Sequence, residues 1–266
     1  GAVTLGSNTV VDTNAASSNT ADITIAAVTG GSNTLTLTTE NNIANADITA
    51  SGAISGVTTL ILASVGGTAT LSGDVDVTTF TADNTVANVA FTGNGSSVTN
   101  AVNFFNDGTL TLGGSNVIQT FGGGFNTDNV GSTVTLEGTS IGNDDFTFGD
   151  LTLDNSATLT LAVGKILTFD DILTVGSNTL TVTADEINFT GGANSVVGTG
   201  TLTLKPVSTG QNMTVGASSD TGTGSIDIID SDIAAIKEGF SSIVLGTSDG
   251  TGSLTISSAS FKDAVV

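Results

Sequence analysis

The chain contains no cysteine, histidine, tryptophan, tyrosine or arginine, and it has only one proline and one methionine. The lack of cysteine excludes disulfides, thiolate catalysis and thiolate metal sites. Nucleophilic catalysis by serine is also hard to build, because no histidine is present to activate the hydroxyl group. No apolar run reaches the roughly 18 residues that a membrane-spanning helix needs, so we expect no membrane insertion.

Positive charge is equally scarce. Four lysines stand against 25 acidic residues, and the formal net charge is −21. Such a chain repels nucleic acids and anionic membranes, so we expect no nucleic-acid partner. Hydrophobic residues still make up 38% of the sequence. A disordered acidic polymer would contain far fewer, so we expect a packed protein with acidic groups on its surface.

Short segments in which apolar residues alternate with threonine recur along the chain. Examples are 35–37, 159–161 and 202–204, each with the sequence Leu-Thr-Leu. Strict alternation over so few residues predicts a half-buried strand, and the intervening Gly, Asn, Ser and Asp residues predict turns. One helical turn is expected between Asp230 and Gly239, where cap residues precede helix formers and a glycine ends the pattern.

Phenylalanine spacing favours one all-β architecture. Phe104, Phe125 and Phe146 follow one another at intervals of 21 residues, and Phe148 precedes Phe169 by the same interval. A repeat of this length is typical of a parallel β-helix, a β-solenoid in which like residues stack in the core. At about 21 residues per coil, the chain would form about 12 coils. The alternative is a set of β-sandwich domains, whose strands also recur.

Strand motifs repeat at similar intervals: Leu159 to Leu180, Leu180 to Leu202 and Leu202 to Ile226 are 21, 22 and 24 residues apart. We therefore expect a single β-solenoid over residues 1–266. It would divide into less regular coils over 1–100 and coils with a phenylalanine ladder over 101–266.

A family resemblance comes from the C-terminal part of the chain. The runs 236–246 (IKEGFSSIVLG) and 249–256 (DGTGSLTI), followed by Phe261-Lys262-Asp263, resemble repeats of bacterial filamentous-haemagglutinin-like surface proteins. The resemblance implies an exported, right-handed parallel β-helix that works at the cell surface or in the extracellular space, in adhesion or in a surface layer.

Catalysis on sugars would need paired carboxyl groups, and the chain offers several neighbouring aspartates. However, a lyase for acidic sugars would also need a cation such as arginine, and sugar clefts present tryptophan or tyrosine. None of the three is present, so we expect no enzymatic activity. The candidate pairs are Asp74 with Asp76, Asp144 with Asp145, Asp170 with Asp171, and Asp230 with Asp232.

The same aspartates are candidate ligands for calcium, because hard cations take several carboxylate and carbonyl oxygens. The alternative interpretation is that exposed aspartates simply favour turns and solubility. Calcium is the one cofactor that the sequence suggests, and none is required. The candidate ligands are Asp144, Asp145, Asp170, Asp171, Asp230 and Asp232.

Three functional hypotheses remain. The chain is a structural subunit that joins copies of itself or other surface components into an extracellular filament, sheath or surface layer. Alternatively, it is the stalk or binding module of a larger adhesin, with a glycan or host receptor as partner. A minor alternative is ice binding by rows of Thr-x-Thr pairs such as Thr158/Thr160, although the pairs recur irregularly in the sequence.

Overall fold

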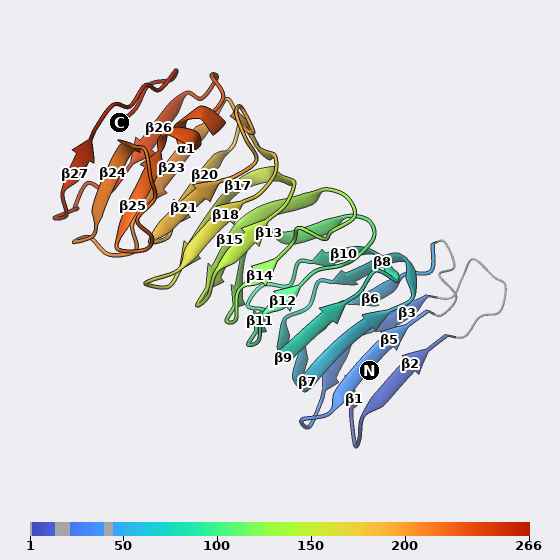
Figure 1. The fold of residues 1–266 in the computed structure, drawn as a ribbon. Helices are drawn as coiled ribbons and strands as arrows, with labels where there is room; N and C mark the ends of the chain where they lie inside the picture. The colour runs from blue at the N-terminus through green and yellow to red at the C-terminus, as the bar shows by residue number, and fades with distance from the viewer. Residues whose placement is uncertain (1, 14–21, 40–44) are drawn as a thin grey trace. The chain divides into compact units, whose positions relative to one another are not determined.

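In a computed structural model that describes residues 2–13, 22–39 and 45–266, the protein is a parallel β-solenoid of about nine turns (Figure 1). Every ladder identified between its strands is parallel, which excludes the antiparallel β-sandwich alternative. The chain divides into two compact units, Gly1–Thr135 and Leu136–Val266. Among the described residues, no helix has the length and apolar character needed to cross a membrane.

Unit 1 contains three stacks of parallel strands, because each turn of the chain contributes a segment to each side of the coil. The first stack is formed by β3 (Ile23–Ile25), β6 (Ile48–Ala50), β8 (Val65–Leu71), β10 (Val86–Phe91) and the start of β13 (Leu110–Phe121). The second is formed by β1 (Ala2–Thr4), β4 (Ala27–Thr29), β7 (Ile54–Ala63), β9 (Val75–Ala82), β11 (Ser97–Val98) and the end of β13. The third contains β2 (Thr9–Asp12), β5 (Thr34–Thr38) and the second halves of β7 and β9, while β12 (Val102–Asn103) pairs with β14 (Phe125–Asn126).

Alternation of apolar and polar residues explains why these segments form strands. In β8, the side chains of Val65, Ala69 and Leu71 are fully buried and the residues between them are partly exposed, apart from buried Gly67. Phenylalanines fill the interior of the later turns of unit 1. The rings of Phe80 and Phe91 meet edge to face, with centroids 5.4 Å apart.

Unit 2 repeats the arrangement of three stacks and adds a further sheet. One stack contains β16 (Phe146–Phe148), β18 (Ile166–Phe169) and β21 (Glu186–Phe189), and another contains the start of β17 (Leu151–Leu161), β19 (Leu173–Gly176) and β22 (Val196–Gly198). The third contains the end of β17, β20 (Thr179–Thr183), β23 (Thr201–Lys205) and β26 (Ser242–Leu245). The further sheet has the order β25 (Ser225–Ile229), β24 (Asn212–Ala217) and β27 (Leu254–Ile256). β15 (Val134–Gly142) contains the boundary between the units.

The predicted phenylalanine ladder is present in unit 2. Phe148, Phe169 and Phe189 stack in successive turns, with centroid distances of 5.6 and 5.4 Å and interplanar angles of 11° and 14°. In unit 1, by contrast, Phe104 and Phe125 meet edge to face at 6.4 Å and 75°. The 21-residue spacing therefore predicted the pairing of Phe148 with Phe169 correctly. It was wrong for Phe104 and Phe125, because Phe125 pairs with Val102 instead.

The prediction of about 12 coils was wrong, because the turns do not all have the same length. Leu35 pairs with Leu60, a step of 25 residues, whereas Leu180 pairs with Leu202, a step of 22. Leu202 then pairs with Ile243, a step of 41 residues. The predicted repeat from Leu202 to Ile226 is therefore also wrong: Ile226 pairs with Met213 instead.

The long turn contains β24, β25 and the helix α1 (Asp230–Ala235). The helix confirms the helical turn expected in this segment. β24 lies between β25 and β27, and all three strands are parallel. An insertion thus doubles the length of one turn while the strands on either side keep their parallel register.

Candidate functional site

The first predicted calcium pair lies at the surface of unit 2 and is held by its own protein contacts. The Asp144 carboxylate pairs with Lys165 at 2.6 Å, and Asp145 accepts a hydrogen bond from the Ile166 amide at 2.9 Å. The hydrogen bond from Lys165 lowers the pKa of Asp144 below its usual range. Both carboxylates therefore link one turn of the solenoid to the next.

The two carboxylates of the second pair, Asp170 and Asp171, also lie in different surroundings. Asp170 accepts a hydrogen bond from the Thr190 hydroxyl at 2.5 Å, while Asp171 is exposed. The Asp170 contact again joins one turn to the following turn, and within the described part of the chain no third carboxylate joins this pair in a group of potential metal ligands.

The third pair lies on α1. Asp230 is exposed, whereas Asp232 is 3% exposed and accepts hydrogen bonds from the amides of Phe189 and Ile229, both at 3.0 Å. Burial raises the pKa of Asp232 to about 6, against the lowering effect of these two hydrogen bonds. Asp232 thus fastens the helix to β21. Within the described ranges, none of the six aspartates belongs to a group of three potential metal ligands, and the role of calcium stays a prediction.

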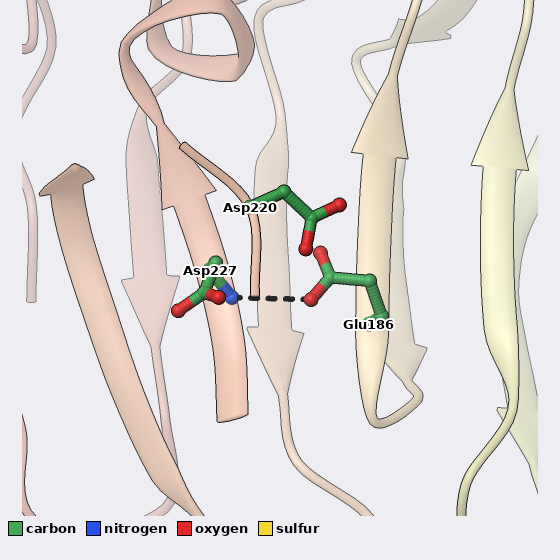
Figure 2. Close-up of side chains that lie close together, drawn as sticks. All are labelled: Glu186, Asp220 and Asp227. Atoms are coloured by element: carbon green, nitrogen blue, oxygen red, sulfur yellow. Dashed lines mark hydrogen bonds between the residues drawn. The ribbon is translucent and has the colours of Figure 1, made fainter. Parts of the chain in front are cut away.

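A different acidic cluster forms where the long turn meets β21. It consists of Glu186 on β21, Asp220 in the loop between β24 and β25, and Asp227 on β25, and we call it the acidic cluster (Figure 2). One oxygen from each of these residues lies within 4.8 Å of the others. Glu186 is completely buried and Asp227 is 2% exposed, while Asp220 is exposed.

Of the two buried members of the cluster, Asp227 accepts more and shorter hydrogen bonds than Glu186. Asp227 accepts hydrogen bonds from the amide and hydroxyl of Thr221 at 2.8 and 2.5 Å, and from the Ser225 hydroxyl at 2.7 Å. Glu186 accepts one from the Ile187 amide at 3.0 Å and a longer one from the Asp227 amide at 3.4 Å. Asp227 therefore has strong donors for a negative charge, and Glu186 has weak ones.

The pKa values follow this difference. Burial raises the pKa of Glu186 to about 8, and the negative charge of Asp220 adds to the effect. Burial would also raise the pKa of Asp227, but the hydrogen bonds from Thr221 and Ser225 outweigh it and hold that pKa below its usual range. Three neighbouring carboxylates could in principle share a divalent cation. The cluster alone does not identify such a ligand, so we assign no ion to it.

The sequence reasoning missed Glu186, Asp220 and Asp227 as a group. Glu186 and Asp227 lie 41 residues apart in the chain, and they meet only because the insertion returns β25 to the neighbourhood of β21. A signal was present in the step from Leu202 to Ile226, which departed from the 21-residue repeat and marked the irregular turn.

Edge strands of both units expose apolar side chains whose register partners on the neighbouring strand are buried in the core. We call each such line of register partners a core column. Leu254 and Ile256 of β27 are 54% and 64% exposed, although their register partners on β24, Met213 and Val215, are buried. In unit 1, Val3 of β1 is 45% exposed and pairs with buried Val28. Each edge strand therefore presents the next layer of a core column with nothing stacked on it among the described residues.

Threonines form short rows on the outer face of β17, β20 and β23. The register places Thr158, Thr181 and Thr203 in one row, and Thr160 beside Thr183 in the next. These side chains are partly exposed. The Thr-x-Thr pairs 158/160 and 181/183 thus align in two turns. The first row continues to Thr203 and ends at Val244, while the second ends at Lys205.

Comparison with protein-family models, curated proteins and solved structures found no match to this chain. The fold is compatible with β-helix repeat proteins.

Proposed function

We propose that the protein is a non-catalytic structural subunit, and that its copies join through their edge strands into an extracellular filament, sheath or surface layer. This role suits the resemblance of its C-terminal segment to filamentous-haemagglutinin-like surface proteins. The observation that carries the proposal is the exposure of Leu254 and Ile256 in register with the buried residues of β24.

The physical reason is that a parallel solenoid buries an inward side chain only by stacking a further turn on it. Fully burying one leucine or isoleucine side chain contributes about 1.5–3 kcal/mol. A further strand would also pair the free backbone groups of the edge. The partner that fits is a second copy, because β1 is likewise an edge strand of its own unit, with the exposed side chain of Val3 in register with buried Val28.

Such a junction is heterologous, since the β27 edge of one copy would meet the β1 edge of another. Heterologous contacts that do not close into a ring generate open filaments. The net charge of −21 opposes association through repulsion between copies. Salt screens that repulsion, with a Debye length of about 10 Å at 0.1 M, so assembly should increase with ionic strength.

Sedimentation velocity and electron microscopy of the purified chain over a range of protein and salt concentrations test the proposal. We expect assemblies that grow with both. Ile256→Asp should abolish them, while Thr255→Asp, which adds the same charge to the same strand on its other face, should weaken them far less. A wild-type monomer under all conditions would overturn the proposal, and glycan or receptor binding by that monomer would favour the adhesin module instead.

Ice binding is the second candidate, favoured by the aligned threonine rows of β17, β20 and β23. A regular array of hydroxyl and methyl groups on a flat sheet can order water. The test is thermal hysteresis of the monomeric protein. Ice binding predicts hysteresis that Thr181→Lys removes and Ile256→Asp retains, and no hysteresis in the wild type would eliminate it.

A further inference from the structure

The acidic cluster brings three carboxyl groups together without a lysine as counterion among the described residues. Glu186 is completely buried and lies beside Asp220 and Asp227. Among the described residues, the one ion pair joins Lys165 and Asp144, so no lysine neutralises the cluster. Burying an unpaired charge is strongly unfavourable, and a carboxyl group in this position takes up a proton instead.

The inserted segment packed near Glu186 contributes acid rather than base. β25 supplies Asp227, the loop before it supplies Asp220, and α1 supplies Asp232. The preceding residue, Asp185, is 4% exposed and accepts hydrogen bonds from the amides of Gly164 and Val207.

The backbones of two lysines lie beside the residues that precede Glu186. Lys165 and Lys205 accept hydrogen bonds at their carbonyl oxygens from the amides of Asp185 and Ala184. The ammonium group of Lys165 is bonded to Asp144. That of Lys205 acts on Asp249, whose pKa is lowered mainly by a hydrogen bond from Thr247 and further by this lysine. Neither lysine therefore serves as a counterion to Glu186.

We propose that Glu186 holds a proton shared with the acidic cluster, and that this proton fastens residues 218–229 to β21 in acid and releases them in base. The protonated carboxyl group of Glu186 can donate a hydrogen bond to a neighbouring carboxylate. Thr221 and Ser225 occupy both oxygens of Asp227, whereas the Gly222 amide donates to Oδ1 of Asp220 alone. Asp220, whose carboxylate faces Glu186 in Figure 2, is therefore the acceptor. At higher pH the proton passes to solvent, and three negative charges then repel one another.

The sign of the pH dependence follows from the direction of the shift. The pKa of Glu186 is about 8 in the folded protein, against an ordinary value of 4.5. Its contribution to stability is therefore complete below about 4.5 and is lost as the pH rises to about 8. Asp232 acts in the same direction at lower pH, because its pKa rises from 3.8 to about 6.

The direct test is infrared spectroscopy of the carboxyl groups. Between the pKa values of about 6 for Asp232 and about 8 for Glu186, Glu186 is the group expected to stay protonated. We expect a carbonyl band of one buried carboxylic acid at pH 7, which disappears with a midpoint near pH 8. Glu186→Gln should remove this band, and Glu238→Gln, an exposed glutamate in the same unit, should retain it. Absence of the band in the wild type at pH 7 would overturn the proposal, even if Glu186→Gln fails to fold.

Hydrogen exchange measures the structural consequence. Peptides that cover β24, β25 and the loop between them should lose protection between pH 5 and pH 9, relative to unit 1 peptides, which correct for the intrinsic rate. Glu186→Gln should remove most of this loss, and Glu238→Gln should leave it unchanged. Equal losses in Glu186→Gln and wild type would contradict the proposal. So would full restoration of wild-type protection at pH 9 by calcium, because the cluster would then take a cation rather than a proton. Neither measurement depends on assembly, so this proposal can fail independently of the structural function proposed above.

Discussion

The ring of Phe148 lies almost parallel to the ring of Phe169 in the next turn of unit 2, with centroids 5.6 Å apart. Phe169 is 1% exposed and also stacks on Phe189. We expect Phe169→Ala to lower the free energy of unfolding by about 3–5 kcal/mol, because it leaves a cavity between two rings. Phe105→Ala, which changes a phenylalanine that is 44% exposed, should have a much smaller effect. Equal effects in urea unfolding would show that the stack is not a core element.

Gly52, Gly73 and Gly93 form a column in which no Cβ atom fits. A Cβ atom on Gly73 would overlap the carbonyl oxygen of Gly52, and one on Gly93 would overlap that of Gly73. Gly73→Ala should therefore force the backbones of neighbouring turns apart and lower the melting temperature. Gly6→Ala is the matched control, since its Cβ atom would meet nothing within 4 Å. A melting temperature unchanged by Gly73→Ala would contradict the close packing of these turns.

Asp227 should stabilise the protein in the opposite pH direction from Glu186. Its pKa is lowered from 3.8 because hydrogen bonds from Thr221 and Ser225 outweigh the effect of burial. Its contribution is therefore present above pH 3.8 and is lost as the pH falls through the lowered pKa. We expect Asp227→Asn to cost about 1–3 kcal/mol near neutral pH and to reduce the loss of stability in acid.

Urea unfolding at pH 2 to 7 measures both effects. Asp154→Asn, which changes an exposed aspartate on β17, serves as the control and should follow the wild type. If Asp227→Asn also follows the wild type through the acid range, its hydrogen bonds do not carry this contribution.

Calcium should act on the six predicted aspartates mainly by screening charge. Asp144, Asp145 and Asp170 are each bonded to a neighbouring turn, Asp171 is exposed, and Asp232 is occupied by backbone amides. Calcium and magnesium should therefore raise the melting temperature by similar amounts. A calorimetric titration with a saturable calcium site that Asp170→Asn removes would contradict this expectation and establish the metal site.

Periodic features of the structure could be predicted from the sequence because they depend on local alternation and on stacking at a fixed interval. The Leu-Thr-Leu segments became strands, and Phe148, Phe169 and Phe189 became a ladder. The glycine column also has a readable signal, since Gly52, Gly73 and Gly93 recur at intervals of 21 and 20 residues.

Features of the long turn could not be predicted in this way. The step from Leu202 to Ile243 contains an insertion, and its strand β25 pairs with the strand before it instead of extending the repeat. The burial of Glu186 depends on that return of the chain. A fixed repeat length therefore could not predict which residues surround Glu186. It also led to an overestimate of the number of turns, because the turns differ in length.

Mixing two variants tests whether copies join through the β27 edge of one and the β1 edge of another. Val3→Asp blocks the β1 edge and Ile256→Asp blocks the β27 edge, so each variant should sediment as a monomer when alone. An equimolar mixture should form heterodimers, because one intact edge of each kind remains. A mixture that stays monomeric while the wild type assembles, or either variant assembling alone like the wild type, would contradict the account.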